Sequence, residues 1–401
     1  MKEPNIDHRD LETWADFLLE HSLGGISPDD RVMIKGERIG WPLMEVLERN
    51  VIRAGAVPDV YLVPPNNDRG RVWSANMGRW GGSSQLERVP GWHADRYDSF
   101  TKYVEVLGAE DPSLYAGLEP EKSAALVAAD GPFAAKRLTK RWVITLFPTP
   151  GLADLEGLPL DELAEFIVGA STTDPAPLRE AEERIAPLFD AGEQVEIVTW
   201  HPLENRDLSL TMSIAGSHSR MSYGLRNFPD GEVFTSPDAR TPCGEVFVDL
   251  PVHQGGGDIR GIYLRLEDGR ITDYSAQEGG AHLESIVETD DGSHRLGEVA
   301  VGMNPGLDRV LKHPLFVEKV GGTAHIAIGA SYQDCFAEDP SSPEGEKRIA
   351  ELAEAGVLNR SAQHVDIVID FRPGGCGRSF AIDGRELVVD GRIWTLGPEK
   401  R

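Results

Sequence analysis

Hydrophobic positions in the first half of the chain follow two alternating periods. Apolar side chains recur at helical spacing in the first predicted helix, at Leu11, Trp14, Phe17 and Leu18. The pair Gly24-Gly25 ends this helix. A short strand at 31–36, an amphipathic helix at 42–56 with Pro42 in its first turn, and a strand at 57–64 follow. This strand–helix–strand spacing favours a parallel sheet.

The remainder of the first half contains one irregular stretch and three further elements. Residues 64–92 are rich in Gly, Asn and Arg, which predicts a long loop. The run RWVITLFPTP, residues 141–150, predicts another buried strand. Two helices follow at about 159–170 and 177–191.

After about residue 192 the pattern changes to short apolar strands. The strand-like runs are EQVEIVTW, DLSLTMSIA, GEVFVDLPV, GIYLRL, AHIAIG, HVDIVID and ELVVD. Asp-Gly pairs at 268–269, 383–384 and 390–391 are typical of hairpin turns. Helices are expected only near 281–289 and 344–355.

The two patterns together predict two domains. Residues 1–200 should form an α/β N-terminal domain with a mainly parallel sheet, and residues 201–401 a β-rich α+β C-terminal domain. A chain of 401 residues is long enough for both domains to bury a core of their own.

Composition narrows the class of partner and the compartment. With 66 acidic and 40 basic residues, the formal net charge is -26, which disfavours nucleic acids and anionic membrane surfaces as partners. The three cysteines follow no disulfide or zinc pattern, which is typical of a reducing compartment. The sequence has neither a signal-peptide core nor an apolar run of about 18 residues, so we expect a cytoplasmic protein.

Polar residues with ligand chemistry stand at the edges of apolar segments in the second half. They are Glu232, Glu298, His325 with Tyr332 seven residues later, and His364 with Asp366. Residues i and i+2 of a strand face the same way, so His364 and Asp366 can grip one metal ion while Val365 points to the opposite face. Two histidines and three carboxylates suit zinc, cobalt or manganese better than calcium. The residues alone leave open that the glutamates are solvated strand ends and the histidines core residues.

Four motifs in order resemble one known family. The segments FPDGEVFTSP, LGEVAVG, HIAIGASY and NRSAQHVD are similar to those of the thermophilic metalloaminopeptidases of the aminopeptidase T and aminopeptidase S type. The resemblance extends upstream to RWVITLFPTPGLA and covers nearly the whole chain. It departs from many members at 318–324, where EKVGGTA replaces an Asp-Glu-Asn-Ala stretch, as in a divergent branch.

The resemblance implies a site and an activity. The family's metal ligands fall on Glu232, Glu298, His325, His364 and Asp366, and its site tyrosine falls on Tyr332. It implies a hydrolase that removes N-terminal residues from short peptides, with two divalent metal ions per chain (Zn, Co or Mn) in a homodimer that encloses the site. Glu232 is then expected to bridge the metals, Glu298 to complete one metal or shuttle protons, and Tyr332 to stabilise the oxyanion.

Two other classes of function remain open at this stage. His325, His364 and Asp366 alone make the 2-His-1-carboxylate set of a mononuclear iron(II) dioxygenase, and a pyridine-ring-cleaving dioxygenase looks related to this family. A non-catalytic metal-binding homologue is the third possibility. Retention of both Glu232 and Glu298 argues against the iron enzyme, because one iron does not need five ligands.

Overall fold

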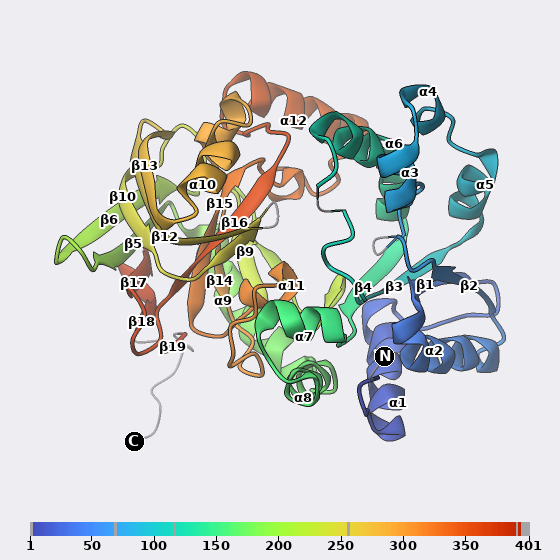
Figure 1. Cartoon of the computed structure of the whole chain (residues 1–401). Helices are drawn as coiled ribbons and strands as arrows, with labels where there is room; N and C mark the ends of the chain where they lie inside the picture. The colour runs from blue at the N-terminus through green and yellow to red at the C-terminus, as the bar shows by residue number, and fades with distance from the viewer. Residues whose placement is uncertain (1–2, 68–69, 116, 255–256, 390–391, 394–401) are drawn as a thin grey trace. The chain divides into compact units, whose positions relative to one another are not determined.

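The chain forms two compact units, which Figure 1 shows in one cartoon. This computed structural model describes residues 3–67, 70–115, 117–254, 257–389 and 392–393. The first unit comprises residues 1–173 and 224–229, and the second comprises 174–223 and 230–401. The chain therefore passes between units after Thr173, before the change of pattern near residue 192, and residues 224–229 return to the first unit.

The first unit is built on a five-stranded sheet in the order β2-β1-β3-β4-β8, in which every pair is parallel. The strands are β1 (Arg31–Glu37), β2 (Val57–Val63), β3 (Lys102–Leu107), β4 (Arg141–Leu146) and β8 (Asn227–Phe228). The parallel sheet expected from the strand–helix–strand spacing is confirmed. Strand β8 could not be expected, because residues 224–229, which contain it, lie in the sequence between two segments of the second unit.

The first unit includes the helices α1 (His8–Asp16) with the π-helical turn η1 (Phe17–Ser22), α2 (Trp41–Arg53), α6 (Pro120–Leu138), α7 (Pro150–Glu156) and α8 (Leu160–Ser171). Of these, α1, α2 and α8 lie where the apolar periodicity predicts them, whereas α6 and α7 were not predicted. The loop predicted for residues 64–92 was wrong in part. This stretch contains α3 (Ala75–Trp80) and α4 (Ser83–Leu86) and leads into α5 (Gly91–Ser99). Helices α3 and α4, of six and four residues, are too short to show a helical period.

The second unit contains a nine-stranded antiparallel sheet, in the order β11-β12-β10-β6-β5-β17-β18-β19 with β13 beside β12. Its strands are β5 (Gln194–His201), β6 (Arg206–Ser213), β10 (Cys243–Val248), β11 (Val252–Gln254), β12 (Gly257–Glu267), β13 (Arg270–Glu278), β17 (Gly377–Ile382), β18 (Arg385–Val389) and β19 (Arg392–Ile393). Of the predicted Asp-Gly turns, the pairs at 268–269 and 383–384 join neighbouring antiparallel strands. The pair at 390–391 lies outside the described residues.

A second, five-stranded antiparallel sheet, in the order β16-β15-β14-β9-β7, carries the polar segments of the sequence motifs. We call it the site sheet. Its strands are β7 (Arg220–Ser222), β9 (Glu232–Thr235), β14 (Leu296–Gly302), β15 (Thr323–Gly329) and β16 (His364–Asp370). Figure 1 shows β14, β15 and β16 among the strands of this unit.

Alternation along the site sheet gives it one apolar and one polar face. Valine and isoleucine side chains of its strands join the large core shared with the nine-stranded sheet; they include Val233, Val299, Val301, Ile326, Ile328, Val365 and Ile367. The other face is available for polar groups, because successive residues of a strand point to opposite sides. Helices α9 (Ala176–Ala191), α10 (Gly280–Val287), α11 (Pro314–Val317) and α12 (Pro343–Glu354) complete the unit.

Across the residues that the structure describes, no helix combines the length and the apolar character needed to cross a membrane.

Candidate metal centre

All five predicted ligands lie on the site sheet, on the face opposite the core. Each comes from a strand whose alternate residues are buried in the core cluster. Glu232 begins β9, Glu298 lies in β14, His325 lies in β15, and His364 and Asp366 lie in β16. Segments separated by up to 134 positions in the sequence are thus brought together by strand pairing alone.

Small residues on the neighbouring strands leave room for these side chains. Glu232 is paired with Gly302, His325 with Ala300, and His364 with Gly329. Glu298 and Asp366 are both paired with Ala327, from opposite sides. Cross-strand neighbours have Cβ atoms only about 5 Å apart, so a large residue at any of these positions would fill the space into which the ligands point.

A β-bulge turns Glu298 toward the site. The register between β14 and β15 shifts between Leu296 and Glu298, which are paired with Ile328 and Ala327. In a regular strand Leu296 and Glu298 would share a face. The extra residue, Gly297, instead lets Leu296 enter the core while Glu298 faces the other ligands. A Cβ atom on Gly297 would lie 2.1 Å from the backbone oxygen of Ala330, so a side chain does not fit there.

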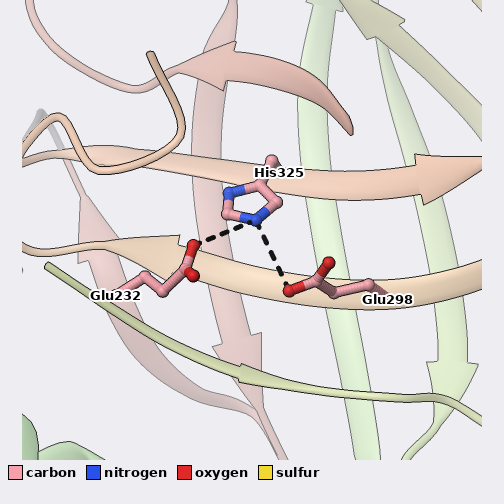
Figure 2. A group of neighbouring side chains, drawn as sticks. All are labelled: Glu232, Glu298 and His325. Carbon is pink, nitrogen blue, oxygen red and sulfur yellow. Dashed lines mark ion pairs between the residues drawn. The ribbon is translucent and has the colours of Figure 1, made fainter. Parts of the chain in front are cut away.

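Glu232, Glu298 and His325 form the first group of possible ligands (Figure 2). The Nε2 atom of His325 lies 3.4 Å from Oε2 of Glu232 and 3.7 Å from Oε1 of Glu298. All three side chains are at least nine-tenths buried. In Figure 2 the two carboxylates approach the same ring nitrogen from different strands, which is the arrangement a shared cation would require.

Glu298, His364 and Asp366 form the second group. Nε2 of His364 lies 2.8 Å from Oε2 of Glu298 and 3.3 Å from Oδ1 of Asp366. Nδ1 of His364 lies 2.7 Å from the backbone oxygen of Ala330, to which it must donate, because a carbonyl only accepts. This contact fixes the ring and leaves Nε2 as the metal-facing nitrogen. Glu298 is common to both groups, with one oxygen toward each histidine.

The residues fit divalent metal ions. Within the described part of the chain, the buried atoms that accept no hydrogen bond of ordinary geometry include Oε2 of Glu232 and Oδ1 of Asp366, both facing histidine nitrogens. Buried acceptors without donors are costly, and a cation at each group would satisfy them. The nitrogen and oxygen donors suit zinc and similar first-row metals.

Without a metal the carboxylates act on the histidines instead. Burial opposes the charged form of His325, but Glu298, Glu232 and Asp366 outweigh it and raise its pKa to about 9. Burial likewise opposes charge on His364, and Asp366 and Glu298 raise its pKa to about 11. Both rings therefore carry protons that a metal ion must displace.

Tyr332 lies beside the second group. Its ring centroid is 4.7 Å from that of His364 and 5.0 Å from that of Phe234, and the side chain is 40% exposed. Partial burial, followed by the charges of Glu298 and Asp366, raises the pKa of its hydroxyl. The hydroxyl therefore stays protonated and able to donate a hydrogen bond.

The sequence interpretation missed three charged residues at this site: Asp230, Glu318 and Lys319. Lys319 is buried, with its Nζ bonded to Oε1 of Glu232, 3.2 Å from Glu318 and 3.8 Å from Asp230. Glu318 also hydrogen-bonds Asp366, and burial with the charge of Asp366 raises the pKa of Glu318 well above its usual value. The available signal was the EKVGGTA segment, where the chain departs from many members of the family it resembles.

Comparison with known proteins indicates the same family as the four sequence motifs. Residues 7–373 match the model of the thermophilic metalloprotease family M29. Aminopeptidase T of Thermus thermophilus is 29% identical over 318 residues, which cover 71% of this chain and 75% of the relative.

Two solved structures share the fold. Wild-type AmpT from Thermus thermophilus superimposes with a TM-score of 0.76 at 22% identity, covering 96% of this chain and 99% of that one. A 2,5-dihydroxypyridine dioxygenase from Pseudomonas putida superimposes with a TM-score of 0.55 at 12% identity, covering 99% of this chain and 100% of the other. The fold is therefore shared by proteins of different chemistry and does not by itself indicate a function. The family match, which covers nine-tenths of the sequence, is the finding that separates a metalloprotease from a dioxygenase. The chain belongs to the thermophilic metalloprotease family M29 and is a metal-dependent hydrolase.

Proposed function

We propose that this metal-dependent aminopeptidase removes N-terminal residues from short peptides at a site where two divalent ions, Zn, Co or Mn, share Glu298. The observation that carries the proposal is the division of the five donors into two groups with Glu298 in common. Glu232, which the family resemblance implied as the bridging ligand, is less suited to that role, because Lys319 engages one of its two oxygens. Glu298 has one oxygen toward each histidine.

The metal ions, when bound, would lower the pKa of a water molecule and polarise the scissile carbonyl. Glu232 and His325 would complete one ion, and His364 and Asp366 the other. The His364 ring is held for this by its bond to the backbone oxygen of Ala330. Glu232 and Glu298, the two glutamates of the centre, would be the candidates for proton transfer.

The Tyr332 hydroxyl would donate a hydrogen bond to the oxyanion that develops on the scissile carbonyl. The position of Tyr332 supports this role, since its ring packs against the ring of His364, a member of the second ligand group, and Tyr332 is not itself in either group. The homodimer and the cytoplasmic location expected from the sequence remain part of the proposal. Light scattering of the purified protein measures the subunit number directly.

Metal content together with activity tests the function. The protein as purified, the protein stripped with EDTA and the protein reloaded with Zn²⁺, Co²⁺ or Mn²⁺ are compared for hydrolysis of Leu-p-nitroanilide and for metal ions per chain. We expect activity to vanish on stripping and to return with about two ions per chain. Full activity of verified metal-free protein would contradict the mechanism.

The same samples, assayed also for iron content and for cleavage of a hydroxylated pyridine, separate the other two functions. A single tightly held iron, with ring cleavage of a hydroxylated pyridine and no peptidase activity, would identify an oxygenase that uses His325, His364 and Asp366. Absence of both activities in metal-loaded protein would indicate a non-catalytic metal-binding homologue.

A further inference from the structure

Lys319 is a buried cation inside the proposed metal centre. Its side chain is 3% exposed. The backbone around it is fixed on both sides, because its N–H donates to the oxygen of Phe316 at 3.1 Å and its own oxygen accepts from Asn304 at 2.9 Å. A lysine is almost never buried unless it is paired with acidic groups, so the burial of Lys319 indicates that its charge is balanced by neighbouring carboxylates.

The Lys319 ammonium group contacts three carboxylates, Asp230, Glu232 and Glu318. We call these four residues the Lys319 cluster. Glu182 of α9 adds a further buried acid, with 0% of its surface exposed. Neither Glu182 oxygen has a hydrogen-bond partner of ordinary geometry among the described residues. Three carboxylates thus contact one fixed positive charge, and Glu182 lies within electrostatic range of it.

Glu232 belongs both to the Lys319 cluster and to the first ligand group. Lys319 engages its Oε1 atom, and His325 faces its Oε2 atom. Glu232 can therefore offer a metal ion one oxygen only, while an ammonium group remains on the other. Lys319 and its three carboxylate partners are not members of the second ligand group. The link between the Lys319 cluster and that group is Glu318, which hydrogen-bonds Asp366.

We propose that Lys319 is a positioning residue with two effects. It holds the acids of the centre together when metal is absent, and it lowers the affinity of Glu232, Glu298 and His325 for their metal ion. The ion at Glu298, His364 and Asp366 is then the tightly held one. The physical reason is Coulombic, because a fixed cation a few ångströms from a divalent ion opposes its binding most strongly where water is excluded. This inference rests on the proposed two-ion centre.

The test uses Lys319→Met, which keeps the length of the side chain and removes its charge. Competition with a chromophoric chelator measures the affinity of each ion, and urea or thermal unfolding measures the stability of metal-free and metal-loaded protein. We expect the weaker ion to bind about tenfold more tightly, or more, with the stronger ion changed much less. The melting temperature of the metal-free variant should fall by roughly 10 °C and recover on metal loading.

Two matched variants control for loss of a lysine and for retained charge. Lys312→Met removes another lysine of the second unit, one paired with Asp258 at 3.0 Å, and should leave both affinities unchanged. Lys319→Arg keeps the charge and should keep the weak and strong ions distinct. Equal affinities in Lys319→Met and the wild type would overturn the inference.

A second variant covers the case in which Lys319→Met does not fold without metal. Asp230→Asn removes one carboxylate partner of Lys319 with little change of volume, so the net charge near the weak ion becomes more positive. Its weak ion should bind several-fold less tightly. An unchanged affinity in this variant would also overturn the inference.

Failure of the inference can be told from failure of the function. If wild-type protein binds two ions of equal affinity and hydrolyses peptides, the function stands and the role of Lys319 is wrong. If the wild type binds at most one ion, the two-ion centre itself is wrong.

Discussion

Gly297→Ala tests the bulge that turns Glu298 toward the metal centre. The added Cβ would lie 2.1 Å from the oxygen of Ala330, 2.4 Å from its carbonyl carbon and 2.5 Å from the oxygen of Gly329. All three atoms belong to the backbone, so no side-chain rotation can relieve the contact. Overpacking a tight interior costs about 1–3 kcal/mol, and we expect a loss of unfolding free energy at the upper end, about 3 kcal/mol.

The same contact should also disturb the centre. The oxygen of Ala330 accepts the Nδ1 hydrogen of His364, and Glu298 follows directly after the substituted residue. A shift of either strand therefore moves two ligands relative to each other. We expect metal affinity to fall more than the change in stability alone would require.

Urea unfolding of metal-free protein measures the first effect, and metal ions retained after dialysis against a chelator measure the second. Gly280→Ala is the matched control. Gly280 begins α10 in the same unit, and a Cβ there would meet no atom within 4 Å. If Gly297→Ala matched this control in both stability and metal content, the bulge would not be what positions Glu298.

Four further outcomes follow from the site and the sheets. Val365→Ala should lower unfolding free energy by about 1–2 kcal/mol with metal content intact, because the side chain is 5% exposed in the core. Asp366→Asn should instead lose metal while the fold persists; two retained ions with full activity would mean a structural hydrogen bond only. Tyr332→Phe should keep metal and lower kcat by about 10²–10³-fold with a small change of KM, and a kcat within a few-fold of wild type would make Tyr332 a packing residue. Burial opposes ionisation of Asp30, but bonds from Ser27, Lys102 and Thr101 lower its pKa to about 2. Its stabilisation is therefore present above its unfolded pKa of 3.8 and lost as pH falls toward 2. Asp30→Asn should cost about 1–2 kcal/mol at neutral pH and flatten that part of the acid-unfolding curve, and an unchanged curve would contradict the role of Asp30.

The sequence predicts several elements whose apolar period is strong, but it does not predict α6, a helix of 19 residues. Helix α2 and strands β1 and β2 appear at the expected positions, and their pairing is parallel. Helices α3 and α4, of six and four residues, lie within the predicted loop, since fewer than two turns show no period. The return of residues 224–229 to the first unit is a long-range pairing that no local pattern encodes.

The candidate centre is predictable only where ligand chemistry coincides with strand alternation. His364 and Asp366 share a face, as their spacing requires, with Val365 in the core. Glu298 could not be placed in this way, because regular alternation would put Leu296 on the same face and only the bulge separates them. Lys319 and Glu318 precede β15 in an irregular segment, where direction cannot be derived from a period.

Because core-facing and ligand-facing side chains alternate along the strands of the site sheet, metal affinity depends on the correct pairing of those strands. A slip of one residue in the pairing of β15 or β16 would exchange the two faces of that strand, placing isoleucines in the centre and a charged ligand in the core. Because the donors come from four strands, one misregistered strand breaks at least one ligand group. Chains with native-like secondary structure but the wrong register would therefore bind metal weakly. A measurement of metal affinity should distinguish them from correctly folded chains.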